Sequence, residues 1–372
     1  MSLATVEQPQ LGNVGRTEKW SRLSPFLRQY GKEALSYATL QDGLEYFVDD
    51  DLGYIAFTSI RHPVFARNGK RIALSDPVCA PESCIPLVER FLRECPSAGF
   101  AVISEPVAAA LRNLGFKVNC LGYEPELPVQ TYNTKGNWKE LDLIKRARNQ
   151  ATREGIVIRE IEKIEKLNKA QLDAVTAAWL QNKPVNDREI WIYARRPLFE
   201  AEPDVRKFFA FDKEGSIIGY AFYDPMYRDG SVYGYAATIV RCDENRFSRL
   251  ATAMHMAAIE RFREDGIEVL NLCLAPFSKL NNGRFNDDFG TKLFFQASER
   301  FGNNIYNFQG LSFHKSKYRG NEKSLYFASN SALPSNDVYL AFLSADITRS
   351  YFSTLARLLL GIVSAPFGRR RA

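Results

Sequence analysis

The order of strands and helices along the chain, which occurs twice, is the feature that most constrains its fold. In the second half, residues 207–226 form two alternating apolar runs around a Lys-Glu-Gly turn, a pattern typical of a β-hairpin. A further strand at 231–241, an amphipathic helix at 248–266 and an apolar strand at 267–277 follow. Strands that alternate with helices in this way predict an α/β layer with parallel pairing.

The first half repeats this order of elements, although no residue-level repeat connects the halves. It combines strands with amphipathic helices, and its last short helix ends at Gly115. A basic helix and one more strand then lead into the second half. The predicted elements are strands at 46–60, 70–78, 99–104 and 156–161, and helices at 85–93, 105–116, 138–155 and about 169–179.

This order predicts an α/β fold class, with two tandem units built on mixed central sheets. The element order resembles the GNAT acetyltransferase fold, in which two central strands splay apart and the donor enters between them. The expected segments are a disordered tail at 1–22, a first unit at 23–135, a basic linker helix with the second, catalytic unit at 136–332, and a basic C-terminal tail at 333–372.

Composition limits the chemistry that the chain can carry. The six cysteines form no Cys-x-x-Cys pair and no histidine lies at zinc-ligand spacing, so no metal site is expected. With three histidines and no Gly-x-Ser-x-Gly motif, a His–nucleophile pair is not expected either. The first 20 residues contain no apolar run, and no stretch reaches the ~20 apolar residues that cross a bilayer, which predicts a cytoplasmic protein with reduced thiols.

Two segments resemble the C-terminal domain of the lysyl- and alanylphosphatidylglycerol synthases, the multiple peptide resistance factor family. They are GIEVLNLCLAPFS at 266–278 and YNFQGLSFHKSKY at 306–318, with weaker likenesses in ALSDPVCAPES at 73–83 and the basic helix at 139–160. The resemblance covers most of the chain. It implies transfer of an amino acid from aminoacyl-tRNA to a lipid headgroup hydroxyl, with no further cofactor. The Fem peptidyltransferases share this tandem architecture and this donor.

The sequence departs from the family pattern at two places. The family strand D-L-M-R becomes Thr238-Ile239-Val240-Arg241, which keeps the arginine and lacks the carboxylate. The family's closing motif KF-x-P-x-W-x-x-RY is altered at 317–326, where Lys317 and Tyr326 remain. Without an acid at position 238 a hydroxyl acceptor lacks its evident base, whereas an amine acceptor needs less activation.

The expected catalytic residues are Arg241, Lys315, Lys317 and Thr238. An aminoacyl ester is already activated, so the site has to position two reactants and stabilise an oxyanion. Arg241 ends a strand before a helix N-terminus, where anions bind, and a surface salt bridge is the alternative. Lys315 and Lys317 are predicted to face one side of a strand and to contact an oxyanion or a phosphate, and a solvated strand face is the alternative.

The expected substrate-binding residues are Asn271, Tyr326, Asp288, Arg146 and Arg148. Thr238, Asn271 or Asp288 could in part replace the missing carboxylate, unless they are structural. Arg146 and Arg148 belong to a basic helix whose charges could follow a phosphate backbone, or simply form a solvated face. Tyr326 is interpreted as a hydrogen-bond donor or as a core residue.

The C-terminal sequence at 339–372 has a short apolar stretch and ends in three arginines. This pattern predicts an interfacial helix that binds anionic phospholipid at the inner face of the membrane, and a helix docked on the protein is the alternative. The expected partners are therefore aminoacyl-tRNA and a membrane surface, and the oligomeric state is left open. A net charge of +6 favours polyanionic partners only weakly.

Two other functions remain compatible with the sequence. A GNAT enzyme that uses acyl-CoA normally has a glycine-rich turn at the strand-to-helix junction, but residues 241–248 contain no glycine and two acids. That objection does not apply to an acyl-carrier protein as donor. A degenerate module that binds lipid or tRNA without catalysis is the second alternative, favoured by the missing carboxylate.

Overall fold

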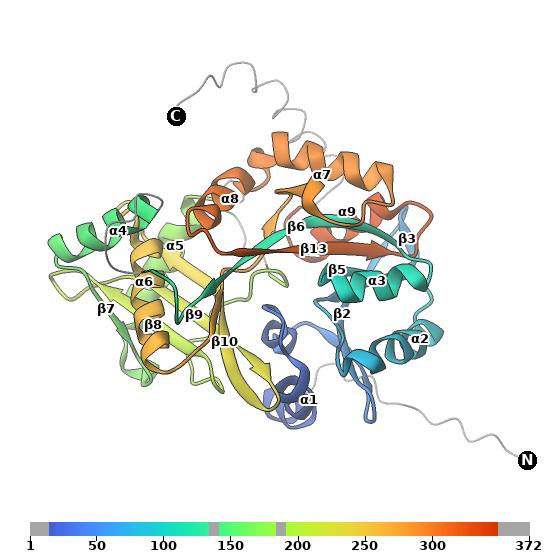
Figure 1. Ribbon diagram of the computed structural model, residues 1–372, viewed down its shortest axis with the longest axis horizontal. Coiled ribbons are helices and arrows are strands. Elements are labelled where there is room, and N and C mark those ends of the chain that lie inside the picture. The colour runs from blue at the N-terminus through green and yellow to red at the C-terminus, as the bar shows by residue number, and fades with distance from the viewer. Residues whose placement is uncertain (1–14, 134–140, 184–190, 349–372) are drawn as a thin grey trace, which may run out of the picture.

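A single mixed sheet runs through the whole molecule (Figure 1). The computed structural model describes residues 15–133, 141–183 and 191–348. Within these residues the strands follow the order β1-β2-β3-β5-β13-β6-β11-β10-β9-β8-β7, with β4 beside β2 and β12 beside β6. No helix in the described part of the chain is both long enough and apolar enough to span a bilayer.

The first unit begins with three antiparallel strands and then crosses over to a parallel one. Strands β1, β2 and β3 pair in sequence, and the crossover helix α2 returns the chain to β5, which runs parallel to β3. Helix α3 then leads into the long strand β6. The elements are α1 (Arg16–Tyr30), β1 (Glu45–Asp49), β2 (Gly53–His62), β3 (Ala66–Leu74), β4 (Val78–Cys79), α2 (Cys84–Glu94), β5 (Ala98–Ile103), α3 (Glu105–Asn113) and β6 (Lys117–Pro128).

The second unit repeats this arrangement. Strands β7 to β10 are antiparallel, and the crossover helix α6 returns the chain to β11, which runs parallel to β10. Helices α4 and α6 lie next to each other beside this part of the sheet (Figure 1). The elements are α4 (Asp142–Arg153), β7 (Val157–Glu160), α5 (Lys169–Gln181), β8 (Arg206–Phe211), β9 (Ile217–Arg228), β10 (Ser231–Cys242), α6 (Leu250–Glu264) and β11 (Val269–Asn271).

The last strand of the chain completes the first unit rather than the second. After β12 (Ala275–Pro276) and helices α7 (Phe289–Phe301) and α8 (Phe308–Ser316), strand β13 (Asn321–Ser329) inserts between β5 and β6. It is antiparallel to both neighbours. The other edge of β6 pairs with β11 and β12, so β6 joins the two units by backbone hydrogen bonds.

The core on each face of the sheet comes from the apolar stripes of the helices. Helix α2, for example, buries Leu87, Val88 and Phe91, and Phe91 packs edge-on against Phe100 of β5. In the second unit, Phe262 of α6 stacks on Tyr235 of β10. Burying a large apolar side chain contributes about 1.5–3 kcal/mol, and these contacts therefore hold the helices to the sheet.

The structure confirms the predicted fold class, an α/β protein with two tandem GNAT-like units. The hairpin at 207–226 appears as β8 and β9, and the basic helix as α4, which is followed by Gly155 in the left-handed region (φ 71°). The strand predicted at 267–277 is present only as the short β11 and β12.

Two predictions, for the N-terminal segment and for the segment around residue 315, were wrong. A third, for the C-terminal tail, concerns residues that are largely outside the described part of the chain. Helix α1 begins at Arg16 and buries Leu23 and Leu27, so residues 16–22 are not a disordered tail. Lys315 and Lys317 lie at the end of helix α8 and not on a strand. Helix α9 (Pro334–Ser344) packs on α7 and β2, whereas the apolar and basic end of the tail, 349–372, lies outside the described residues.

The shared sheet predicts that the first unit does not fold without β13. A fragment of residues 15–133 lacks the strand that separates β5 from β6, so we expect it to show no cooperative thermal unfolding by circular dichroism. Because Asn321 lies opposite Glu126, residues 321–330 can be appended after residue 133 through a short Gly-Ser linker. This hairpin is expected to restore a cooperative transition, whereas a scrambled strand is not. Cooperative unfolding of the bare fragment would contradict the prediction.

Candidate functional site

The candidate active site is the gap that opens where strands β10 and β11 part. Their parallel pairing runs only from Gly234–Val269 to Ala236–Asn271. Past that point β10 bulges, and the chain after β11 turns at Cys273, which has a φ of 60°. A non-glycine residue in the left-handed region costs free energy and is held here by a hydrogen bond from its N–H to Asn271 Oδ1 (2.6 Å).

The first unit has no comparable opening among the described residues. Strands β3 and β5 part after Leu74–Ala101, and Asp76 lies just beyond that point. Its carboxylate accepts hydrogen bonds from the N–H (2.8 Å) and the hydroxyl (2.6 Å) of Ser104, which tie the two strand ends together. A side-chain contact therefore bridges the strand ends in the first unit, whereas in the second unit the chain turns away from β10 at Cys273.

Lys315 holds the turn that shapes the gap. Its ammonium group donates to the carbonyl oxygens of Cys273 (3.0 Å) and Leu274 (2.7 Å). Burial lowers the pKa of Lys315 to about 8, and the nearby Cys273 and Glu124 oppose that shift. A cation at this position places positive charge next to the strand end where an ester carbonyl could bind.

A buried carboxylate faces Lys315 from the shared strand β6. Burial raises the pKa of Glu124 to about 7, and the amide of Asn271 stabilises its ionised form. Glu33, from the segment after α1, lies close enough to be affected: burial raises its pKa to about 8, with contributions from Asp76 and Glu124. The first unit therefore contributes two neighbouring carboxylates, Glu33 and Glu124, and Glu124 lies near Lys315.

Lys317 lies on the other side of the gap, against the first turn of α6. Its ammonium group donates to the Thr252 hydroxyl (2.6 Å) and contacts Nδ1 of His314 (3.1 Å). Burial, and then the neighbouring Arg249, lower the pKa of Lys317 to about 8. Burial lowers the pKa of His255 to about 3, so this ring is neutral at physiological pH and contacts the Tyr223 hydroxyl (3.0 Å).

Arg241 lies inside the protein, in contrast to the surface arginine considered from the sequence. Its side chain is 4% exposed, and the guanidinium lies 4.7 Å from the ring centroid of Trp179 on α5. The ammonium group of Lys183 lies 4.5 Å from the same ring. Burial lowers the pKa of Lys183, because a charged amine loses hydration there. Two cations thus share one indole near the end of β10.

A second buried group of charges lies on β9 and the loop before β8. Arg195 donates to both carboxylate oxygens of Asp224 (3.0 and 2.6 Å) and also bonds Glu202. Lys207 forms an ion pair with Glu202 at 2.7 Å. Two cations and two carboxylates therefore compensate one another within the fold, as buried charges require.

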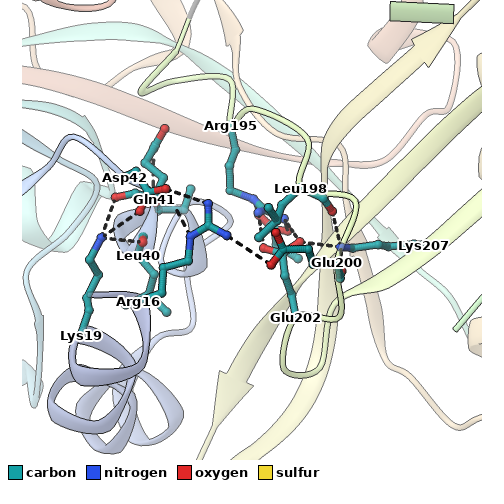
Figure 2. Close-up of polar contacts among 12 residues, drawn as sticks. Arg16, Lys19, Leu40, Gln41, Asp42, Arg195, Leu198, Glu200, Glu202 and Lys207 are labelled. Atoms are coloured by element: carbon teal, nitrogen blue, oxygen red, sulfur yellow. Dashed lines mark hydrogen bonds and ion pairs between the residues drawn. The ribbon is translucent and has the colours of Figure 1, made fainter. Parts of the chain in front are cut away.

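A cavity of about 530 Å³ lies in front of Arg195, between helix α1 and the loop at 191–203. Figure 2 shows Arg16 between Asp42 of the first unit and Glu200 of the second, with Lys19 on one side and Arg195 and Glu202 on the other. Indole and phenol rings complete the wall. The cavity is lined by Arg16, Thr17, Lys19, Trp20, Tyr37, Leu40, Gln41, Asp42, Trp191 and residues 195–198 and 200–203.

A second cavity, of about 430 Å³, has a basic wall. It lies between α4 and the start of α6 and is lined by Arg146, Asn149, Arg153 and Arg249. Arg249 immediately precedes α6, where the partial positive charge of the helix adds to its own. Three arginines in one cavity favour an anionic ligand.

Five of the residues selected from the sequence lie along the gap or on the elements next to it. Asn271 and Lys315 both bond to the turn after β11, Thr238 and Arg241 lie on β10 past its pairing with β11, and Lys317 contacts Thr252 of α6. Among the described residues, no group of three His, Cys, Asp or Glu side chains is placed to bind a metal ion.

The other four selected residues lie elsewhere. The Tyr326 hydroxyl donates to Glu105 (3.0 Å) and accepts from the Arg284 N–H inside the first unit, and Asp288 caps α7 by accepting from the Thr291 N–H (2.8 Å). These contacts match the structural alternative for both side chains and place neither at the gap. Arg146 lines the basic cavity, whereas Arg148 faces Glu260 at 3.8 Å.

Sequence reasoning missed Glu124, Asp224, Arg195, Lys183 and Arg249. A signal was available for two of them: Glu124 and Asp224 are acidic residues within strands that are buried along most of their length. A buried strand tolerates such a charge only with a compensating partner, so its presence indicates a functional or ionic site. Arg195 and Lys183 lie outside any regular pattern and gave no such signal.

Comparison with known proteins gives consistent results. The profile of the family described as "Phosphatidylglycerol lysyltransferase, C-terminal" matches residues 25–329. An uncharacterized protein of Corynebacterium glutamicum is 22% identical over 336 residues, 87% of this chain and 40% of the relative. A phosphatidylglycerol lysyltransferase of Staphylococcus xylosus is 21% identical over 295 residues, 78% of this chain and 33% of the relative. The chain thus spans about a third to two fifths of the length of these curated relatives.

A solved structure supports the same fold. L-PGS from Bacillus licheniformis superposes with a TM-score of 0.71 and 19% identity, over 91% of this chain and 99% of that one. At this level of identity the likeness concerns the fold, and the residues of the gap have to be interpreted from their own contacts.

The raised pKa of Glu124 leads to a stability prediction. The folded-state pKa of about 7 lies above the ordinary value of 4.5, so the folded protein binds this proton more tightly. Ionisation of Glu124 therefore costs stability as pH rises from about 4.5 to 7, by up to about 3 kcal/mol. We expect Glu124→Gln to raise the thermal unfolding temperature at pH 8 and to leave it nearly unchanged at pH 4.5.

Glu268→Gln is the matched control, because Glu268 forms an exposed ion pair with Arg228 at 2.8 Å and is not among the groups that shift the pKa of Glu124. An unfolding temperature of Glu124→Gln that differs from the wild type by the same amount at both pH values would contradict the prediction.

Proposed function

Because the chain belongs to the phosphatidylglycerol lysyltransferase C-terminal family, we propose that it is an aminoacyltransferase. It moves an amino acid from aminoacyl-tRNA to a lipid headgroup of the phosphatidylglycerol type. The observation that carries this proposal is the gap between β10 and β11, which is bordered by the buried cations Lys315 and Arg241 and the partly buried Lys317, and which lies next to the arginine-walled cavity.

The reaction requires positioning and charge stabilisation more than it requires a strong nucleophile. The acceptor oxygen forms a bond to the ester carbonyl carbon, which places negative charge on the carbonyl oxygen. That charge collapses as the bond to the ribose oxygen breaks, and the ribose oxygen takes up the proton that the acceptor hydroxyl released. Lys317 and Arg241 stabilise the transient oxyanion, because fixed cations in a buried site act without solvent reorganisation.

The donor approaches from the side of α4 and α6. Arg249 lies close enough to Lys317 to lower the pKa of that ammonium group, so the basic cavity and the gap are neighbours. Arg146, Arg153 and Arg249 bind phosphates of the acceptor end of the tRNA, which places its terminal ester near Lys317. The same cavity also fits the single phosphate of an acyl-carrier donor, which makes that donor the second candidate.

The lipid acceptor approaches through the cavity between α1 and the loop at 191–203. Its wall combines indole rings from Trp20 and Trp191 with cations and carboxylates, groups that can bind both the phosphate and the glycerol hydroxyls of a headgroup. The cations Arg16 and Lys19 pair with Asp42 of this wall. This arrangement supports a peripheral position on the inner face of the membrane, with anionic phospholipid as the partner of the basic C-terminal tail. The activated ester supplies the driving force, so the proposal needs no further cofactor.

Lys317 provides the direct test of the reaction. Lipids from cells with and without the protein are separated by thin-layer chromatography, and the purified protein is assayed with phosphatidylglycerol vesicles and charged tRNA. We expect a new aminoacylated lipid that RNase prevents. Lys317→Ala should lower the rate ~100-fold or more through loss of oxyanion stabilisation.

The pH profile tests the charge state of Lys317. A lysine is cationic below its pKa, so the wild-type rate should fall as pH rises through about 8. Lys317→Arg keeps its charge and should move this fall to higher pH. A product that forms with equal yield after RNase treatment would support the acyl-carrier donor instead, and no new lipid under any condition would contradict the enzymatic proposal.

Arg249 tests the donor side. Arg249→Gln should raise the KM for aminoacyl-tRNA ~10-fold at low salt, with less effect at high salt, because the lost contact is with a phosphate. Arg246→Gln is the control: Arg246 lies nearby but pairs with Asp212 and does not line the cavity. An equal effect of the two substitutions would indicate a general loss of charge and no specific site.

A further inference from the structure

We propose that Asp224 of β9 replaces the carboxylate that the family carries at position 238, and that it acts on the acceptor through the hydroxyl of Thr238. This inference rests on the proposed aminoacyl transfer and assigns the proton acceptor that the sequence of β10 lacks. Asp224 is a positioning residue in this scheme, and Thr238 is the group that touches the acceptor.

The register of the sheet places the two side chains together. Asp224 lies opposite Ala236 on β10, and the register shifts between Ala237 and Ile239. Thr238 is therefore the extra residue of a β-bulge, a feature that re-aims a side chain and is common next to active sites. Residues on neighbouring strands lie about 5 Å apart, so a carboxylate on β9 can occupy the space that a carboxylate on β10 would fill.

The environment of the Thr238 hydroxyl is unusual. Its oxygen is buried and makes no hydrogen bond of regular length and angle among the described residues. It lies close enough to the Asp224 carboxylate to lower the pKa of that group. Buried hydroxyls are nearly always satisfied, so an unsatisfied one beside a carboxylate and an open gap indicates a place for a ligand oxygen.

The ion pair with Arg195 does not by itself explain Asp224. Arg195 and Lys207 balance Asp224 and Glu202, which keeps the carboxylate available in its ionised form although burial raises its pKa. Asp224 also acts across the gap: it contributes to the raised pKa of the Cys273 thiol after the turn that follows β11. The Asp224 carboxylate thus interacts both with Arg195 of the loop before β8 and with Cys273 next to the gap.

The proton transfer is balanced as follows. While the acceptor oxygen bonds to the ester carbonyl carbon, its proton passes to Thr238 Oγ1, and the proton of Thr238 passes to Asp224. When the tetrahedral intermediate collapses, the electron pair of the breaking carbon–oxygen bond stays on the ribose oxygen. That oxygen takes the proton of Thr238, Thr238 is reprotonated by Asp224, and Asp224 returns to its ionised form. A positioned proton acceptor of this kind typically contributes 10²–10⁴-fold to a rate.

Relocation of the carboxylate is the decisive experiment. In the lipid assay with charged tRNA, we expect Asp224→Asn to lower kcat ~100-fold with little change in KM. Adding Thr238→Asp to that variant restores a carboxylate at the family position and should return kcat to within ~10-fold of the wild type. Thr238→Val should resemble Asp224→Asn, while Thr238→Ser should remain active. Full activity of either Asp224→Asn or Thr238→Val, or a double variant as inactive as Asp224→Asn, overturns the proposal.

A measurement without any substrate keeps this test separate from the proposed function. Thermal unfolding of the wild type, Asp224→Asn, Thr238→Asp and the double variant forms a double-mutant cycle. Two adjacent carboxylates repel, so Thr238→Asp should lower the unfolding temperature of the wild type more than that of Asp224→Asn. Additive shifts would show that the side chains are too far apart, and would overturn the inference even if aminoacylated lipid is formed. If Asp224→Asn does not fold, the comparison of Thr238→Val with Thr238→Ser decides.

Discussion

The hydrogen bonding of β6 along both of its edges is the constraint on which the rest of the structure depends. One edge pairs with β13, the last strand of the chain, and the other with β11 and β12. Since β13 lies between β5 and β6, neither unit has a complete sheet of its own. The same ladder places Asn271 of β11 opposite Glu126 of β6, two residues from Glu124, so the contact that joins the units also builds one wall of the gap.

Several charged side chains are buried around the gap, and each needs a partner that stabilises its charge. The ammonium group of Lys315 is stabilised by hydrogen bonds to two backbone carbonyls and by the nearby Glu124. The guanidinium of Arg195 is stabilised by ion pairs with two carboxylates. Burying a charge is costly, and the shifts of Lys315 and Lys317 toward a pKa of about 8 show that part of this cost remains. Such perturbed pKa values cluster at functional sites, where a charged side chain has to remain able to interact with a substrate.

Local pattern was sufficient for the fold class, because alternation and amphipathic periodicity are set by neighbouring residues. It was not sufficient for β13, whose partners β5 and β6 are about two hundred residues away and whose own sequence allows either unit. The segment around Lys315 was predicted as a strand because a short run with alternating apolar residues fits both the helical and the strand periodicity. Asn307 caps the helix that forms instead, by accepting from the Gly310 N–H (3.0 Å).

The site shows why a motif followed along one strand can be misleading. In a sheet, a point in space next to one residue is also next to the residues opposite it on the two neighbouring strands. A carboxylate can therefore be lost from one position and gained at another while the charge in the site is unchanged. Thr238 interpreted alone indicates an incomplete catalytic motif, whereas Thr238 together with Asp224 and Arg195 is a compensated group with one unsatisfied hydroxyl. Function in this fold is accordingly better judged from the side chains around the gap than from the sequence of β10 alone.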